Sequence, residues 1–315
     1  MDIAPGHADH DAGDCLGSSR KYVHIHANPP PNALESKAFA INDLNQIGGV
    51  FTRPNEPAAA YHGFLLSGGT YTTIDVPNSI GTAIVGTAVD GISNLGDIVG
   101  NFQDSTGVHS YLLSGGTFTK IDVPGATGGT FANAINDAGR IGGVFTDTAG
   151  DHAFLLSAGI LTTFDVPGAT TSSAIFGMND LGQIVGAFVD TKGLHGYLLS
   201  GGMFAIDVPN ANYTQAFGIN DLGVISGAYS AGGKIHGFEL DGGVFSTIDV
   251  PNTFLGTALF KSNDAGLIVG DSDFGLGTLQ IAFLATPVPE PGSWLILATG
   301  LVSMLGYCWR RKQAA

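Results

Sequence analysis

A unit of about 42 residues recurs along most of the chain, and this repetition constrains the fold more than any other feature. Three landmarks keep a constant order in the copies. The first is an asparagine followed by a turn, at Asn42, Asn94, Asn136, Asn179, Asn220 and Asn263. The second is a triplet of His, a small residue and an aromatic residue, beginning at His62, His109, His152, His195 and His236. The third is Asp-Val-Pro, ending at Pro77, Pro124, Pro167, Pro209 and Pro251. This pattern predicts a repeat architecture in which each unit packs against its neighbours.

The fourth copy contains four short strands separated by turn residues. We predict strands at residues 174–178, 183–188, 195–199 and 203–208. The segments Asn179–Gly182 and Asp190–Gly193 begin with Asn or Asp and end with Gly, which is typical of type I turns. Ser200–Gly202 predicts a hairpin, because Gly accepts positive φ. Pro209 ends the last strand, since proline has no N–H for the ladder.

Four strands in about 42 residues predict one blade of a β-propeller. The 48 glycines and the low charged fraction of 12% suit tight turns better than a helical bundle. An antiparallel sandwich is the alternative, but it does not explain the strict repetition.

Six asparagine turns predict six blades over residues 38–286. The sixth copy lacks a fourth strand and an Asp-Val-Pro. Residues 21–27 resemble the missing strand, because Tyr22–His26 aligns with Tyr71–Asp75, Tyr on Tyr and Ile on Ile. We therefore predict an all-β, six-bladed propeller over residues 21–286, closed by a strand at residues 21–27 and preceded by a disordered lead at residues 1–20.

The aligned histidines raise the question of a metal site, and three of them follow an Asp at the same offset: Asp104, Asp147 and Asp190. A metal needs three or four converging ligands, whereas one pair per blade places equivalent groups far apart around a ring. We expect each Asp to cap its own turn and each His to hydrogen-bond within its blade or to the next. We predict no metal site and no cofactor.

Two further aspartate patterns are interpreted as structural. The Asn-Asp-x-Gly turns lack the alternating oxygen ligands and terminal Glu of a calcium loop. The aspartate of Asp-Val-Pro occurs once per blade, which suggests that it caps the crossover between strands: Asp75, Asp122, Asp165, Asp207 and Asp249.

Function is expected in the variable loops, because repeated residues seldom form the asymmetric cluster that catalysis needs. The loops after each Asp-Val-Pro and between the second and third strands should emerge on one face, around the central channel. Arg53, Asn55, Tyr213 and Phe254 are the candidate ligand-binding residues there, and the alternative is that these loops are simply solvated. No catalytic residue is predicted. Glu56 and Glu239 are nearly the only glutamates in the repeats, and they are isolated in the sequence.

The net charge of −15 disfavours nucleic acid as a partner, because an acidic surface repels phosphate. The two cysteines, Cys15 and Cys308, lie in opposite tails, so no internal disulfide framework is expected.

The composition changes after Pro287, and residues 287–315 form a distinct tail. Residues 294–309 carry no charge, Trp294 and Trp309 bracket this run, and Arg310, Arg311 and Lys312 follow it. This pattern predicts a transmembrane helix with a cytoplasmic basic end and the repeats on the other side. A buried core helix is the alternative. No apolar run precedes the repeats, so no signal peptide is visible; either the true start lies upstream, which we favour, or this copy is not exported.

The tail resembles the bacterial PEP-CTERM sorting signal, whose Pro-Glu-Pro motif corresponds to Pro289, Glu290 and Pro291. The resemblance implies recognition and cleavage by an exosortase, passage through the inner membrane and transfer to the cell surface, often in connection with exopolysaccharide or biofilm in Gram-negative bacteria. The repeats also resemble the HAF family of extracellular repeats, whose His-Ala-Phe triplet appears here as His152–Phe154. That resemblance implies a surface location and no particular activity.

We expect a non-enzymatic protein, anchored in the membrane by its C-terminal helix and then displayed at the cell surface or secreted. It would serve as an extracellular interaction or matrix module, with extracellular polysaccharide as a candidate partner. The alternative is a propeller hydrolase or lyase acting on extracellular polysaccharide, which would require acidic or His side chains unique to single blades in one channel mouth.

Overall fold

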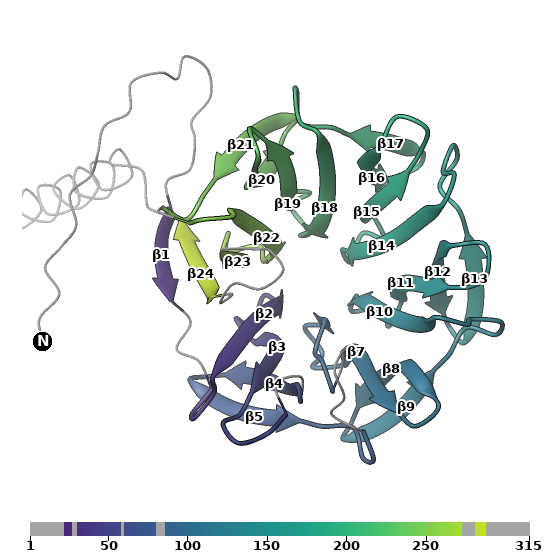
Figure 1. The fold of residues 1–315 in the computed structure, drawn as a ribbon, viewed down its shortest axis with the longest axis vertical. Helices are drawn as coiled ribbons and strands as arrows, with labels where there is room; N and C mark the ends of the chain where they lie inside the picture. Colours follow the sequence, from purple (N-terminus) through teal and green to yellow (C-terminus); the bar gives the residue numbers. More distant parts are fainter. Residues whose placement is uncertain are drawn as a thin grey trace, which may run out of the picture. The chain divides into compact units, whose positions relative to one another are not determined.

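The computed structural model describes residues 22–26, 30–57, 60–79, 86–251, 253–272 and 281–287, without the side chains of residues 22–26 and Ile281. Every helix or strand assigned in this part of the chain is a β-strand, and the strands form several largely antiparallel sheets (Figure 1). The all-β prediction is confirmed. Six four-stranded units are arranged around a central axis (Figure 1).

The units follow the chain order except for the last one. Unit 1 contains β2 (Glu35–Ile41), β3 (Ile47–Thr52), β4 (His62–Ser67) and β5 (Thr70–Ile74). Unit 2 contains β6 (Gly91–Ile92), β7 (Ile98–Asp104), β8 (Gly107–Ser114) and β9 (Thr117–Ile121). Unit 3 contains β10 (Gly129–Ile135), β11 (Ile141–Thr146), β12 (Asp151–Ser157) and β13 (Ile160–Phe164). Unit 4 contains β14 (Ser172–Met178), β15 (Ile184–Val189), β16 (Leu194–Leu199) and β17 (Met203–Ile206). Unit 5 contains β18 (Tyr213–Ile219), β19 (Ile225–Ala231), β20 (Lys234–Asp241) and β21 (Val244–Ile248). Unit 6 contains β22 (Thr257–Ser262), β23 (Ile268–Ser272), β24 (Ile281–Pro287) and β1 (Tyr22–His26).

The four strands predicted for the fourth copy are all present in unit 4, with ends that differ by one or two residues. The first begins two residues earlier, at Ser172, and the fourth ends two residues earlier, at Ile206. The turns between them are those that the Asn, Asp and Gly residues predicted.

A glycine in the second strand allows that strand to lie close against the first. A Cβ atom placed on Gly186 would lie 1.9 Å from the carbonyl oxygen of Ala174, and one on Gly49 would lie 1.9 Å from that of Lys37. No side chain fits such a gap, so the repeat keeps glycine there for a steric reason.

Hydrophobic cores lie between the units, and the sixth core joins the two ends of the repeat array. Val269 and Ala282 of unit 6 pack in one cluster with Ala38, Ile41 and Ile47 of unit 1. The other five clusters each combine residues of two consecutive units. Because every unit has a neighbour on both sides, the repeat buries its apolar faces without a capping unit.

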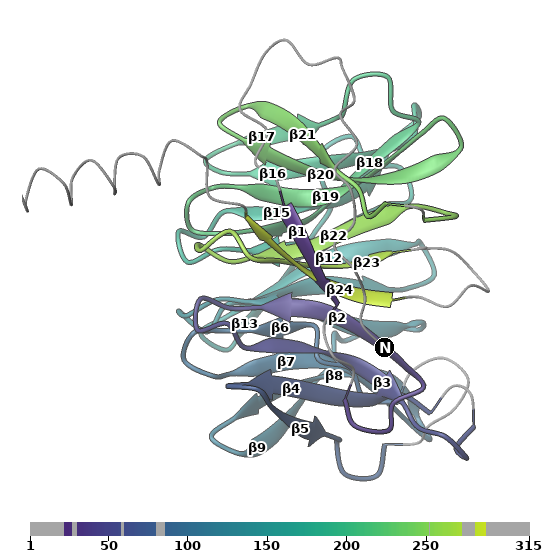
Figure 2. The ribbon, with the colours of Figure 1, turned by 90° about the vertical axis from the view of Figure 1, so that its left-hand side faces the viewer.

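β1 supplies the fourth strand of unit 6 and pairs antiparallel with β24 (Figures 1 and 2). The register differs from the alignment of Tyr22 with Tyr71. Ile74 lies opposite Gly63, whereas Ile25 lies opposite Leu284, the counterpart of Leu65. The predicted register is therefore wrong by two residues.

Candidate functional site: the axis of the ring

The turn between the first and second strands of each unit is built around one asparagine. In unit 1 the Asn42 Oδ1 atom accepts hydrogen bonds from the main-chain N–H groups of Leu44 and Gln46, at 3.1 and 3.0 Å. Asn45 takes a positive φ of 60°, where the five other copies have Gly. A short amide side chain that bonds its own main chain is typical of such turns.

Unit 2 departs from this pattern and corrects the sequence alignment. Ser93, and not Asn94, stands at the place of Asn42, and its hydroxyl accepts the Asp97 N–H at 3.2 Å. Asn94 takes the place of Asp43, the next residue in the turn. Asn94 was misaligned because asparagine, which fills the first turn position in the other five units, stands at the second position in unit 2.

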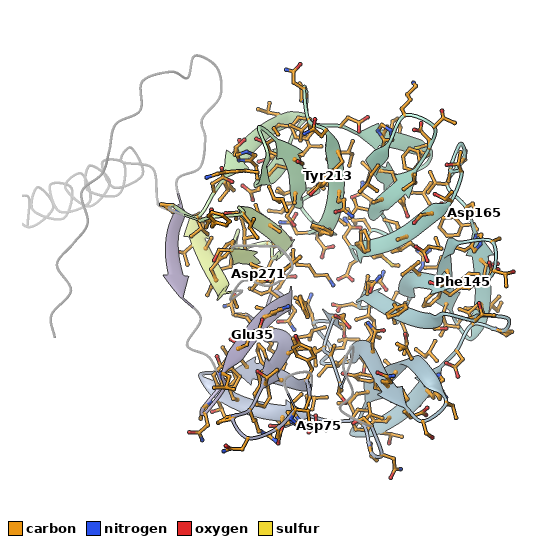
Figure 3. The ribbon with its side chains drawn as sticks, viewed as in Figure 1. Glu35, Asp75, Phe145, Asp165, Tyr213 and Asp271 are labelled. Atoms are coloured by element: carbon orange, nitrogen blue, oxygen red, sulfur yellow. The ribbon has the colours of Figure 1, made fainter. Side chains whose placement is uncertain are left out.

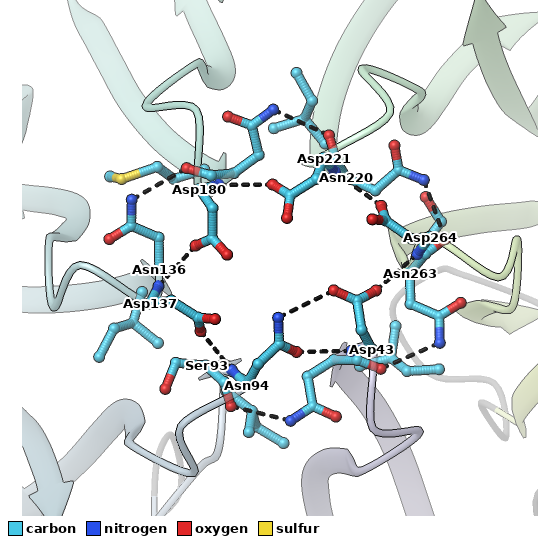
Figure 4. A pocket seen from close by; sticks show the side chains of 18 residues that line it. Asp43, Ser93, Asn94, Asn136, Asp137, Asp180, Asn220, Asp221, Asn263 and Asp264 are labelled. Carbon is cyan, nitrogen blue, oxygen red and sulfur yellow. Dashed lines mark hydrogen bonds between the residues drawn. The ribbon is translucent and has the colours of Figure 1, made fainter.

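The second residue of each turn joins its unit to the next in a continuous ring of hydrogen bonds (Figure 4). Each main-chain N–H donates to the side-chain Oδ1 of the following unit. Each residue donates to the next in the order Asp43, Asn94, Asp137, Asp180, Asp221, Asp264 and back to Asp43. The successive distances are 2.9, 2.6, 2.7, 2.7, 3.0 and 2.8 Å.

The buried asparagines form a second set of links beneath the first. The Nδ2 group of each donates to the main-chain carbonyl of the corresponding residue in the next unit, at 3.0–3.1 Å. The five donors are Asn42, Asn136, Asn179, Asn220 and Asn263. Ser93 has no amide, so the link from unit 2 to unit 3 is missing from this set. The two sets fix six main-chain turns around one axis.

Five carboxylates therefore surround one mouth of the axis, together with Asn94. The space between them is small, about 70 Å³. Burial raises the pKa of Asp180 and of Asp264, and the neighbouring carboxylates raise both further. This end of the axis carries a concentrated negative potential.

Asp43, Asp221 and Asp264 offer carboxylate oxygens within 4.8 Å of one another, an arrangement that could hold a metal ion. Both oxygens of Asp43 already accept hydrogen bonds, from Asp264 N–H and from the Asn94 amide. The sequence argument that equivalent groups lie far apart does not apply here, because these turns lie next to the axis.

The predicted His–Asp pairs lie within their own units, toward the periphery, as the labelled Asp75 and Asp165 show (Figure 3). In unit 4, His195 bonds Asp207 through Nδ1 at 2.8 Å and Asp190 through Nε2 at 3.1 Å. Units 2 and 3 repeat this arrangement, with His109 between Asp104 and Asp122 and His152 between Asp147 and Asp165. In unit 1 His62 bonds Asp75 and Glu56, so Glu56 is not isolated.

The expected capping role of the turn aspartates is confirmed. Asp190 Oδ1 accepts the N–H groups of Lys192 and Gly193, which lower the pKa of Asp190. The hydrogen bond to Asp207 raises the pKa of His195. The aspartates of Asp-Val-Pro bond the histidine of the same unit, which differs from the predicted cap of a crossover. In units 1 to 4 the histidine thus ties the turn before its strand to the end of the next strand, and in unit 5 His236 bonds Asp249.

The four candidate loop residues come from three different units. Arg53 stacks over Phe51 and lines a peripheral pocket beside β5, which places it away from the axis. Asn55 is exposed in a turn with φ of 70°. Tyr213 begins the inner strand β18, and Phe254 is 78% exposed before unit 6. Neither Tyr213 nor Phe254 is among the residues that line the Arg53 pocket.

A belt of inward-facing residues that the sequence analysis missed lies three residues before each turn. Four units carry phenylalanine there, at Phe39, Phe176, Phe217 and Phe260. Units 2 and 3 carry Asp90 and Asn133 instead, and Lys261 of unit 6 lies beside them. These exceptions are the asymmetric residues of the axis. The position could have been found by aligning the inner strands on the turns and searching for breaks in the repeated Phe.

The predicted sorting and anchor residues, Pro289–Pro291, Trp294, Trp309 and Arg310–Lys312, lie outside the described residues. In the portion of the chain that is described, no helix is long and apolar enough to cross a membrane.

Residues 287–312 match the family model of the PEP-CTERM protein-sorting motif. The match confirms the predicted sorting motif, and it implies an exosortase-sorted protein that is membrane-anchored or secreted to the surface. A comparison with curated protein sequences finds no match.

The ring resembles solved structures at low sequence identity. TolB from Acinetobacter baumannii shares 12% identity with a TM-score of 0.54, over 79% of this chain and 65% of TolB. Regucalcin from Agrobacterium tumefaciens shares 14% identity with a TM-score of 0.47, over 88% of this chain and 99% of that one. A gluconolactonase from Xanthomonas campestris shares 12% identity with a TM-score of 0.47, over 82% and 87%. The chain spans about two thirds of the length of TolB, and that likeness shows the fold alone.

Proposed function

We propose that the six units form a closed six-bladed β-propeller that the PEP-CTERM tail delivers to the cell surface, where it acts as a non-enzymatic interaction module. Ring closure is supported by the hydrogen bonds from unit 6 to unit 1 and by the core between them. The resemblance of the repeats to HAF-family extracellular repeats agrees with a surface location.

The observation that carries the non-enzymatic role is the engagement of the repeated polar residues in internal contacts. His109, His152 and His195 each bridge two carboxylates of their own unit. The aspartates around the axis, such as Asp180 and Asp221, accept main-chain N–H groups of the neighbouring units. Groups used in this way hold a scaffold, and the proposed partner, an extracellular polysaccharide, would bind on the loops and rims of the ring.

A polysaccharide hydrolase or lyase is the second candidate, and Asp90 and Lys261 favour it. Each occurs in one unit only and lines the axis. Burial raises the pKa of Asp90 to about 7 and lowers the pKa of Lys261 to about 8, which suits acid–base chemistry near neutral pH. The space beside them is about 200 Å³, which is small for a polymer chain.

The test compares binding with turnover on the same polysaccharides. The full chain in detergent is applied to an array of bacterial exopolysaccharides, and the polymers it retains are then incubated with it and analysed for chain length and for new reducing or unsaturated ends. Retention without shortening supports the interaction module. Turnover that is lost in Lys261→Met and Asp90→Asn would show that the protein is the hydrolase or lyase and not the interaction module. Failure to retain any polymer would contradict both candidates.

A further inference from the structure

The belt of residues around the axis forms a well with aromatic walls. Phe39, Phe260, Phe217 and Phe176 come from four consecutive units and contact one another edge to face or tilted, with ring centroids 5.4–5.5 Å apart. The well has a volume of about 200 Å³, room for roughly seven water-sized groups. Its walls are therefore apolar on four of six sides.

The two remaining sides are polar, and Lys261 reaches them from unit 6. Its Nζ group donates to the main-chain carbonyls of Asp90 at 2.6 Å and of Asn133 at 2.7 Å. An ammonium group has three N–H donors, so these two bonds leave one further donor at the wall of the well. Carbonyl dipoles hold the cation in place without neutralising its charge.

Asp90 is the acidic group nearest to this cation in the belt, and it is an incomplete counter-charge. Its Oδ2 atom accepts a hydrogen bond from the Asn101 amide at 2.8 Å. The hydrogen bond from Lys261 goes to the main-chain carbonyl of Asp90 and not to this carboxyl, and burial raises the pKa of the carboxyl to about 7, which weakens it as a counter-charge. The well therefore presents a positive charge against aromatic walls.

We propose that this well binds a small apolar carboxylate, with its ring or hydrocarbon part against the phenylalanines and its carboxylate on the Lys261 ammonium. An amine would meet the like charge of Lys261. A neutral apolar molecule would cover the remaining N–H without giving it an acceptor. The site is separate from the proposed polysaccharide partner, because its volume suits a molecule the size of benzoate.

The experiment uses the full chain in detergent and three probes of similar shape: benzoate, benzamide and benzylamine. Calorimetric titration at pH 7 should give saturable binding of benzoate, at least tenfold weaker binding of benzamide and no binding of benzylamine. Because this comparison uses the wild-type chain, it does not depend on whether a variant folds.

Two variants locate the site. Lys261→Met removes the charge while keeping a chain of similar length, and Phe217→Leu removes one aromatic wall. Each should weaken benzoate binding at least tenfold, whereas Arg53→Met, at the peripheral pocket, should leave it unchanged. Unfolding curves of each variant show whether the ring is intact.

Three results would overturn the proposal: no saturable benzoate binding to the wild type, equal affinities for benzoate and benzylamine, or unchanged benzoate affinity in folded Phe217→Leu. None of them bears on polysaccharide retention, so the two proposals fail separately.

Discussion

Asn179→Ala should destabilise the ring, because Asn179 joins unit 4 to unit 5 and also forms its own turn. The side chain is 4% exposed. Its Nδ2 group donates to the Asn220 carbonyl at 3.0 Å and to the Gln183 side chain at 2.8 Å, and its Oδ1 accepts the Gln183 N–H at 2.9 Å.

The expected magnitude follows from these bonds. At about 1 kcal/mol for each largely buried hydrogen bond, Asn179→Ala costs about 2–3 kcal/mol. For a domain of this size, that lowers the melting temperature by roughly 5–10 °C. Thermal unfolding followed by circular dichroism, with urea unfolding to obtain the free energy, measures both quantities.

Unit 2 provides the matched controls. Asn179→Ser copies Ser93, so it should keep the turn bond, lose the link to the next unit and cost about half as much as Asn179→Ala. Ser93→Asn should supply the missing link to unit 3 and raise the free energy of unfolding by up to about 1 kcal/mol. If Asn179→Ala and Asn179→Ser both stay within about 0.5 kcal/mol of the wild type, the reasoning about the asparagine links is refuted.

Three other changes test the packing and electrostatics of the ring by unfolding measurements. Gly186→Ala should lower the free energy of unfolding by about 3 kcal/mol, because the new Cβ would meet the Ala174 carbonyl. Gly202→Ala should change it little, because a Cβ there would lie 3.8 Å from its nearest neighbour. Equal effects of the two variants would contradict the steric explanation. Asp180→Asn should keep an oxygen that accepts the Asp137 N–H, just as the Asn94 amide oxygen accepts the Asp43 N–H. It should stabilise the ring above pH 7, because it removes a carboxylate whose pKa is raised by burial. Asp180→Ala should instead cost about 1 kcal/mol of unfolding free energy, and the account fails if the two variants behave alike. His195→Gln should destabilise most at pH 6 and least at pH 8, because a raised histidine pKa gives stability that is lost as pH rises through it; a pH-independent difference would contradict the charged pair.

The repeat in the sequence was sufficient to predict the all-β units, their strands and the role of the N-terminal strand, because turn residues and alternation are local signals. The two-residue error in the register of β1 arose because alignment of Tyr22 with Tyr71 uses sequence likeness, whereas the register depends on pairing with β24. Asn94 was misaligned for a similar reason, since its role is visible only from its bond to the neighbouring unit.

The axial residues could not be found from one unit at a time. Asp90 and Lys261 are 171 residues apart, and the arrangement of the units around one axis brings them together. The His–Asp pairs, in contrast, were correctly interpreted as local, because His195 and Asp190 are five residues apart and occupy one turn and the strand after it.

Removal of residues 1–28 tests most directly the central claim that the ring is closed and that β1 completes its last unit. The control lacks residues 1–21 and keeps β1, so it separates the strand from the segment before it. The account predicts an unchanged melting temperature for the control and a loss of about 10 °C or more without β1, corresponding to about 3 kcal/mol or more. Equal melting temperatures for the two shortened chains would contradict the claim.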